Sequence, residues 1–477
     1  MEGKNPQESI IESKLFKIPI DKYEEDMDTE LAKGKKNEIL DLLNNSNHLR
    51  TEKEFKEIEY YLHDACEEGD VDLIKIYLSE TINNDSNGLQ FKIDSTNRTA
   101  SLFKINKEIE EFFVPRTVEH GSIEYLITSI CVTSLYLKTL KFVEDSAVKT
   151  IYEYMFPYSS RIREIYIPTS LKELKDGWCC YTYNLTKIKI SPSNGQFKVE
   201  EDKYLIGKSD PNKDEFDTLL FACRDIEEIS IPPNIKIISS FAFQHCKKIT
   251  KVEIPTNSNL QIIKRNAFSE INIKTIFIPS KVSKICECSF LECKNLTKVE
   301  IPTNSNLQTI GRSEFWDSNI KSFFIPSNVS KICYGAFSYC TNLTKVEIPT
   351  NSNLQTIESN AFSSSKIKSF FIPSNVSKIC YGAFQNCKNL TKIVIPPNSN
   401  LQTIESNAFS SSKIKSFFIP SNVSTIFKDA FSDCFDLQII EISEESKMKS
   451  FQLSNFGQKL KCIIMIPTSL EKLIQFE

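Results

Sequence analysis

Glycine and histidine are scarce in this sequence of 477 residues. Its 12 glycines make up about 2.5% of the chain, against a usual ~7%. The two closest, Gly195 and Gly207, are twelve positions apart, so any motif with two glycines inside six residues is absent. This excludes the dinucleotide fingerprint, the phosphate-binding P-loop and the nucleophile elbow.

The four histidines are scattered, and none forms the His-Glu-x-x-His pair of a zinc protease. They are His48, His63, His120 and His245. We therefore expect no enzyme, with no catalytic, cofactor-binding or metal-binding residues.

Long apolar stretches are also missing. No run approaches the ~20 residues of a membrane span, and the N-terminus lacks the apolar segment of a secretory signal. The 15 cysteines are an odd number, so at least one thiol is free or paired with another chain. Without a signal peptide, a reducing compartment is the simpler expectation, and it favours a cytoplasmic protein.

No charge of either sign dominates. The chain has 58 basic and 62 acidic residues and a net charge of -4. This near-balance gives no reason to expect a nucleic acid or an anionic membrane as a partner.

From residue 231 onward the sequence repeats itself. Prolines that follow an apolar residue recur at alternating steps of 23 and 24 residues, so two kinds of unit alternate in a double repeat of 47 residues. Residues 302–348 and 349–395 are identical at 35 of these 47 positions. A fixed period in this range predicts a solenoid. The prolines are Pro232, Pro255, Pro279, Pro302, Pro326, Pro349, Pro373, Pro396 and Pro420.

Each unit has the same internal order. Residues Leu343 to Pro349 alternate apolar and polar side chains near the proline, which predicts one short, half-buried strand per coil. A polar turn and a second apolar patch with a phenylalanine follow. A residue that recurs once per coil stacks along the solenoid axis, so we expect a continuous aromatic spine. Its members are Phe243, Phe268, Phe290, Phe315, Phe337, Phe362, Phe384, Phe409, Phe431 and Phe456.

The pattern of strand, proline and Ala-Phe-x-x-Cys resembles the leucine-rich repeats of the BspA-like family. Examples are Leu296 to Pro302 and Ile332 to Cys340. The resemblance covers about residues 110–477. It implies a right-handed leucine-rich repeat solenoid with one short β-strand per coil of 23–24 residues. Members are often surface antigens or adhesion proteins of bacteria and parasitic protists, so the resemblance implies the cell surface as the alternative location.

An insertion within residues 192–226 interrupts the regular spacing of the repeats. Two apolar stretches, Phe197 to Ile206 and Phe216 to Phe221, flank a turn at Ser209 to Asn212. This arrangement predicts a β-hairpin that projects from the solenoid.

The residues before the repeats differ in kind. We expect a flexible N-terminus at 1–25, a small α-helical segment at 26–90 and a bridging segment at 91–109. Two glycine-led apolar stretches, Gly34 to Leu43 and Gly69 to Leu78, are 35 residues apart. They resemble degenerate ankyrin-type hairpins; an unrelated helical cap over the first coil is the alternative.

The cysteines follow the repeat. One set recurs every 47 residues, which places its members about 10 Å apart, two coils away. A disulfide needs Cα atoms within about 7 Å, so neighbours in this set cannot be bridged. We expect buried free thiols and no zinc site, since no Cys-x-x-Cys pair or nearby histidine accompanies them. The set is Cys246, Cys293, Cys340, Cys387 and Cys434.

The strands predict two outward-facing columns, which we expect on a concave face. Alternate coils carry phenylalanine in the first column, and exposed apolar side chains often mark interaction sites; cross-strand packing is the alternative. We predict a non-enzymatic protein–protein interaction module without a cofactor. An intracellular scaffold or adaptor is the alternative, and the coil edges could also pair with a second copy. The predicted partner-binding residues are Phe277, Phe324, Phe371, Phe418, Glu253, Glu300, Glu347, Lys298, Lys345 and Lys392.

Overall fold

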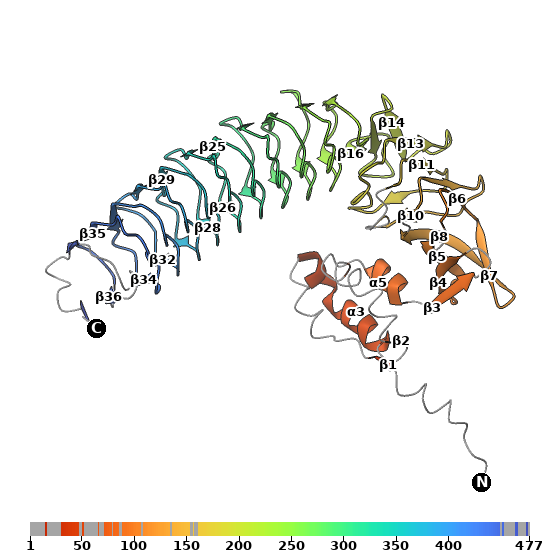
Figure 1. Ribbon diagram of the computed structural model, residues 1–477, viewed down its shortest axis with the longest axis horizontal. Coiled ribbons are helices and arrows are strands. Elements are labelled where there is room, and N and C mark those ends of the chain that lie inside the picture. Colours follow the sequence, from red (N-terminus) through yellow and green to blue (C-terminus); the bar gives the residue numbers. More distant parts are fainter. Residues whose placement is uncertain are drawn as a thin grey trace, which may run out of the picture. The chain divides into compact units, whose positions relative to one another are not determined.

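The computed structural model describes residues 15–16, 30–46, 50–51, 65, 71–78, 80–84, 88–105, 108–133, 136–152, 156, 161–448, 451–452, 463–465 and 474–475. The chain forms two compact units (Figure 1). Unit 1 comprises residues 1–182 and 189–194, and unit 2 comprises residues 183–188 and 195–477.

Unit 1 begins with two α-helices, α3 (Glu30–Ser46) and α5 (Val71–Leu78). Ile39, Leu43 and Ile74 are fully buried, so an apolar stripe joins the helices. The short strands β1 (Leu15–Phe16) and β2 (Arg50–Thr51) pair antiparallel. Apart from β1, the expected flexible segment lies outside the described residues. Most of the chain between the helices does too, so the ankyrin resemblance stays a prediction.

An antiparallel meander occupies residues 80–105, where we expected the last helical residues and a bridge. Its strands are β3 (Glu80–Asn84), β4 (Leu89–Asp94) and β5 (Thr99–Ile105). β5 then pairs in parallel with β8 (Ile123–Thr133). The meander therefore covers the first edge of the repeat sheet, which would otherwise expose unpaired backbone groups.

The first coils of unit 1 continue two sheets. One has the order β12-β10-β8-β5-β4-β3, with β7 beside β8, and the other has the order β13-β11-β9-β6. The remaining strands are β6 (Glu111–Val114), β7 (Thr117–His120), β9 (Thr139–Phe142), β10 (Thr150–Ile151), β11 (Glu164–Ile167), β12 (Glu173–Leu174) and β13 (Lys187–Ile190).

Unit 2 contains the predicted strand in each coil, and parallel pairing stacks these strands. We call them the front strands. They are β17 (Glu228–Ser230), β19 (Lys251–Glu253), β21 (Thr275–Phe277), β23 (Lys298–Glu300), β25 (Ser322–Phe324), β27 (Lys345–Glu347), β29 (Ser369–Phe371), β31 (Lys392–Val394), β33 (Ser416–Ile419), β35 (Ile439–Ile442) and β37 (Ile463–Met465).

Each coil also has a second strand of two residues, where the sequence predicted only an apolar patch. These rear strands pair in parallel as well. They are β18 (Ile237–Ile238), β20 (Ile262–Ile263), β22 (Lys284–Ile285), β24 (Thr309–Ile310), β26 (Lys331–Ile332), β28 (Thr356–Ile357), β30 (Lys378–Ile379), β32 (Thr403–Ile404) and β34 (Thr425–Ile426). The short strands β36 (Phe451–Gln452) and β38 (Ile474–Gln475) pair beyond them.

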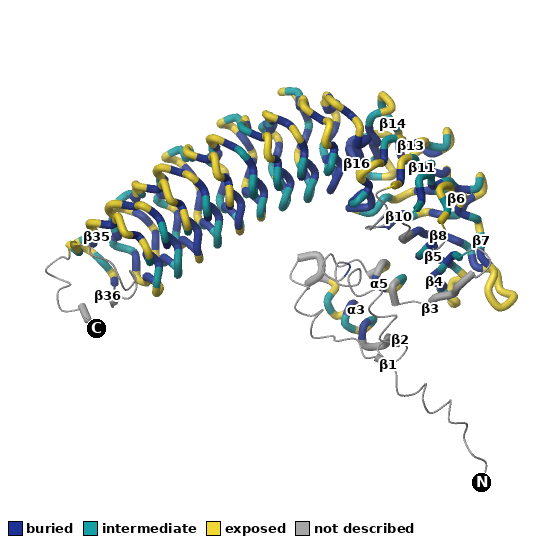
Figure 2. Tube along the Cα trace, in the orientation of Figure 1, coloured by how far each residue is buried: buried dark blue, intermediate teal, exposed yellow. Residues whose placement is uncertain are grey.

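In the view of Figure 1, β25, β29 and β35 lie along the outer edge of unit 2, and β26, β28 and β34 along its inner edge. The front strands, which we expected on a concave face, therefore lie on the outer side of the bend in this view. Figure 2 shows exposed positions recurring from coil to coil along that edge.

The predicted aromatic spine is confirmed from Phe243 to Phe431. Consecutive rings stack with centroids 4.9 to 5.4 Å apart and interplanar angles of 3° to 15°. The front strands add a second set of buried rings. Phe370, for example, lies 5.0 Å from Phe362 and 4.9 Å from Phe384.

Two residues with a left-handed backbone conformation, one two positions before and one two positions after, flank each spine phenylalanine. They explain how a chain with few glycines can turn in every coil. Around Phe384, Gly382 has a φ of 60° and Asn386 a φ of 57°. Glycine occupies the first of these positions only at Gly335 and Gly382 in unit 2. Elsewhere the first position is taken by Phe241, Asn266, Cys288, Ser313, Asn360, Asn407 and Asp429. Asn and Asp tolerate this conformation better than most residues.

The insertion forms three strands, β14 (Phe197–Glu200), β15 (Tyr204–Gly207) and β16 (Thr218–Ala222). β14 and β15 make an antiparallel hairpin. β15 pairs with β16, which pairs in parallel with the first rear strand, β18. The hairpin thus continues the rear sheet instead of projecting from it, because Leu205 and Phe221 are fully buried.

Candidate interaction surface

The front strands bring the predicted binding residues together in two columns. In the first column, phenylalanine lies opposite the outward residue of the next coil: Phe277 is in register with Glu300, Phe324 with Glu347, and Phe371 with Val394. The second column alternates small polar residues with lysines, as in the pairing of Ser369 with Lys392. Parallel pairing joins these strands in four groups, β17 with β19, β21 to β27, β29 with β31, and β33 to β37. The ten predicted residues hold the same two outward positions of the strands in these groups.

The four phenylalanines of the first column are half-buried, not fully exposed as we expected. The residues on either side of each phenylalanine in the sequence are buried. None of the four makes a ring contact in the described part of the chain. The inward neighbours, such as Phe323 beside Phe337 at 4.8 Å, make those contacts instead. Each outward phenylalanine therefore keeps a free apolar edge.

Ion pairs within single strands neutralise most charges of this face. Lys251 Nζ lies 2.9 Å from Glu253 Oε2, and the equivalent distances are 2.7 Å for Lys298–Glu300 and 2.6 Å for Lys345–Glu347. The hydrogen bond to Glu253 raises the pKa of Lys251. Lys392 departs from this pattern, because Val394 occupies the position that is glutamate in the coils of Lys251, Lys298 and Lys345.

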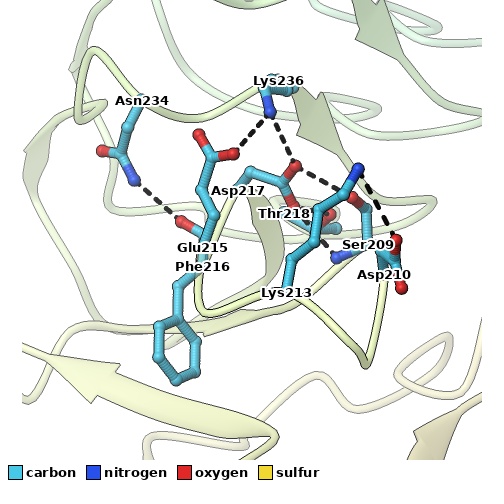
Figure 3. A network of polar contacts seen from close by, with 9 residues as sticks. All are labelled: Ser209, Asp210, Lys213, Glu215, Phe216, Asp217, Thr218, Asn234 and Lys236. Carbon is cyan, nitrogen blue, oxygen red and sulfur yellow. Dashed lines mark hydrogen bonds and ion pairs between the residues drawn. The ribbon is translucent and has the colours of Figure 1, made fainter.

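Polar contacts anchor the loop of the insertion to the next coil (Figure 3). Asp217 accepts hydrogen bonds from the backbone N–H of Ser209 at 2.9 Å and from its hydroxyl at 2.8 Å. Lys236 Nζ lies 2.7 Å from Glu215 and 3.3 Å from Asp217. Burial raises the pKa of Asp217, but the bonds from Ser209 and Lys236 outweigh it, so that pKa is lowered overall. The network therefore fastens the loop to the next coil.

The repeated cysteines donate hydrogen bonds inside the core. The thiol of Cys387 lies 3.1 Å from the carbonyl oxygen of Phe362 in the preceding coil, and Cys340 contacts Phe315 in the same way at 3.0 Å. Each carbonyl also accepts a backbone N–H, from Ser365 and Ser318 respectively, both at 3.1 Å, so the thiol is a second donor that links adjacent coils. Burial raises the pKa of Cys340 to about 12, which keeps the reactive thiolate form rare.

We expect nearly all 15 thiols to be free. Twelve cysteines whose side chains the structure describes form no disulfide. Titration of denatured, non-reduced protein with a thiol reagent should therefore give close to the full complement, while the folded protein reacts slowly because its thiols are buried. A count several pairs short would contradict free thiols and a reducing compartment.

One buried carboxyl group, which we did not expect from the sequence, breaks the repeat. Glu314 is fully buried at a position where the neighbouring coils have Ala336 or Ala361. Its Oε2 accepts a hydrogen bond from the backbone N–H of Gly311 at 2.8 Å, and its Oε1 has no partner. Burial raises the pKa of Glu314 well above its usual range. The signal in the sequence was glutamate in a column of alanine, three residues after a glycine.

A histidine and a carboxylate meet near the start of unit 2. His245 Nδ1 lies 3.2 Å from Glu270 Oε2, and the ring of Tyr183 contacts His245 edge-on at 4.3 Å. The close approach of His245 lowers the pKa of Glu270.

The described ranges contain no group of three or more His, Cys, Asp or Glu side chains that could hold a metal ion. Among the helices that the structure describes, none is long and apolar enough to cross a membrane.

Several solved structures of leucine-rich repeat proteins are similar to this chain. No curated protein matches the sequence. Among solved structures, a leucine rich cell surface protein from Faecalibacterium prausnitzii is 17% identical with a TM-score of 0.44, and the match covers 83% of this chain and 98% of that chain. A leucine-rich repeat protein from Eubacterium ventriosum is 18% identical with a TM-score of 0.39, covering 74% and 95%. The pneumococcal vaccine antigen PcpA is 16% identical with a TM-score of 0.38, covering 83% and 96%.

The BspA type leucine rich repeat region matches in six copies, over residues 123–200, 215–344, 308–438 and 355–473. These residues make up more than half of the chain and coincide with the coils of front and rear strands. The chain therefore belongs to the family of BspA-type leucine-rich repeat proteins.

Proposed function

We propose that this protein binds a protein partner on the face made by the front strands. The observation that carries the proposal is the column of Phe277, Phe324, Phe371 and Phe418, whose half-buried rings recur every second coil and make no ring contact. Repeat proteins commonly bind along an extended face of this kind. Such a partner would meet several equivalent contacts at once.

The energetics of the face suit association. A half-buried aromatic ring still exposes apolar area, and removing such area from water contributes about 25 cal/mol per Å². The ring is already held in place by its neighbours, so binding orders few additional side chains. The Lys–Glu pairs beside the rings resemble the polar rim of an interface, with the aromatic residues at its centre.

Substitution of Phe324, Phe371 and Phe418 by serine tests the proposal. We expect affinity capture of the partner with the full chain to be lost while the melting temperature falls only slightly, because these rings are partly solvated. The matched control is Phe370→Ser, which removes a fully packed ring next to the same face and should lower the melting temperature strongly. If the triple variant melts as low as the control and still captures its partner, the rings serve packing instead.

Two cellular locations are compatible with this binding function. Family resemblance supports a surface adhesion role, whereas the free, buried thiols support a scaffold or adaptor in a reducing compartment. Antibody labelling of intact and permeabilised cells separates them, since a surface protein is labelled without permeabilisation.

A further inference from the structure

Charge is unevenly distributed along the solenoid although the whole chain is nearly balanced. Residues 359–428 contain eight lysines and one acidic residue, Glu405, which gives 8 − 1 = +7. The preceding 70 residues, 289–358, contain six basic and six acidic residues and are neutral. The repeat itself therefore does not require the positive charge, since neighbouring coils of the same length lack it.

Seven of these lysines have no carboxylate within ion-pair distance in the part of the chain that the structure describes, and all seven are exposed. Glu405, the one acidic residue of the segment, is already paired with Lys378 at 2.7 Å. Lys428 lies at the end of the segment, and we call the other six the lysine patch: Lys366, Lys368, Lys388, Lys392, Lys413 and Lys415.

Backbone hydrogen bonds bring the patch together on three successive coils. The N–H of Thr391 donates to the carbonyl oxygen of Lys368 at 3.0 Å, and the N–H of Lys415 donates to that of Thr391 at 3.2 Å. Lys368 and Lys415 are thus two coils apart, about 10 Å. Lys392 lies in the coil between them, in register with Ser369. The positive charges therefore form a cluster along the solenoid axis.

Apolar side chains of the front face border this cluster. Val394 is 39% exposed, in register with the half-buried Phe371. In the coils of Lys298 and Lys345 the equivalent position carries a glutamate that neutralises the lysine. The substitution by Val394 thus removes a negative charge and adds an apolar surface at the same point.

We propose that the lysine patch binds an acidic, extended segment of a partner protein, with apolar side chains of that segment against Phe371, Val394 and Phe418. This inference rests on the proposed function and names where on the face the partner binds and what its chemistry is. An extended chain advances about 3.3 Å per residue, so acidic residues three apart match the lysine spacing of about 10 Å. Complementary charge also steers association.

The composition of the patch favours a protein segment over other polyanions. Residues 359–428 contain no arginine, the residue that most often forms bidentate contacts to phosphate and to base edges. Single-stranded nucleic acids also stack their bases on open aromatic platforms, whereas Phe371 and Phe418 are half-buried between strands. An acidic peptide needs only point charges and a shallow apolar contact.

The test uses the full chain and defined probes. The variant replaces Lys368, Lys392 and Lys415 by glutamate. The matched control replaces Lys247, Lys248 and Lys284, three exposed lysines outside the patch, in the same way. The probes are a fluorescent peptide of Glu-Phe-Ser repeats, the same peptide with lysine for each acidic residue, a single-stranded DNA, heparin, and vesicles containing phosphatidylserine.

We expect the acidic peptide to bind and the lysine peptide not to bind. The patch variant should bind the acidic peptide about tenfold more weakly, about 1.4 kcal/mol, and the control variant should bind like the parent. Added salt should weaken binding. Equal affinity of parent and patch variant overturns the inference, and so does tighter binding of DNA, heparin or vesicles at the same lysines.

The outcome separates this inference from the proposed function. If the phenylalanine variant loses its partner but the patch variant keeps it, the front face binds protein while the acidic chemistry is wrong. If neither variant affects capture, both proposals fail.

Discussion

Substitution of Phe337 by alanine should lower the free energy of unfolding by about 3–5 kcal/mol. This spine ring is fully buried. It stacks on Phe315 at 5.4 Å and on Phe362 at 5.1 Å, and Phe323 meets it edge-on at 4.8 Å. Alanine would remove these contacts and leave a cavity that the neighbouring coils, held by backbone hydrogen bonds on both sides, cannot fill.

Chemical denaturation followed by circular dichroism measures this loss. A solenoid is stabilised mainly by contacts between adjacent coils. The coils before and after residue 337 should therefore unfold less cooperatively, which broadens the unfolding transition or divides it into two. Phe324→Ala in the same double repeat is the matched control, since its ring is half-buried, and it should cost clearly less. If Phe337→Ala and Phe324→Ala lowered the free energy of unfolding equally, this would contradict the view that the stacked phenylalanines stabilise the core more than the front-face ones.

Exchange of Glu314 for alanine, together with Gly311→Cys, should stabilise the protein at neutral pH by roughly 1–3 kcal/mol, the cost of a buried polar group without a partner. The pair would then match the next coil, where Cys333 precedes Ala336. Gly311→Cys alone should destabilise, because its Cβ would lie 2.8 Å from Glu314 Oε2, a contact that the double variant removes.

The pH dependence follows from the raised pKa of Glu314. The folded chain keeps this carboxyl protonated at pH values where the unfolded chain has lost the proton. The proton on Glu314 therefore favours the folded chain. This contribution to the free energy of unfolding is fully present below the pKa of the unfolded chain, about 4.3, and is lost as the pH rises through the pKa of the folded chain. The advantage of the double variant should thus grow from acid toward neutral pH in thermal melts. A pH-independent difference would show that the carboxyl is ionised in the fold.

The repeat architecture could be predicted from the sequence because every coil repeats the same constraints. The step between prolines located the front strands, and the phenylalanine column located the spine. The rear strands could not be distinguished from an apolar patch, since two residues are too short to show an alternating pattern. The half-burial of the Phe324 column also depends on the side chains of adjacent coils, which a single strand does not show.

Departures from the repeat were harder to predict. In the meander at residues 80–105, β4 and β5 are buried on both faces over much of their length, so polar and apolar residues do not alternate cleanly. The inserted hairpin was recognised from its turn, but its pairing with β16 and β18 is a tertiary contact. The lysine patch was hidden by the balanced charge of the whole chain, because acidic residues elsewhere compensate for it.

Site-specific photo-crosslinking tests most directly the claim that the front face binds a protein partner. A photoreactive residue at Ser369 lies on this face beside Lys392, and one at Gln402, also exposed, lies next to the rear strand β32. We expect the full chain to crosslink its partner from position 369 and not from position 402. Crosslinks from position 402 alone would contradict binding on the front face.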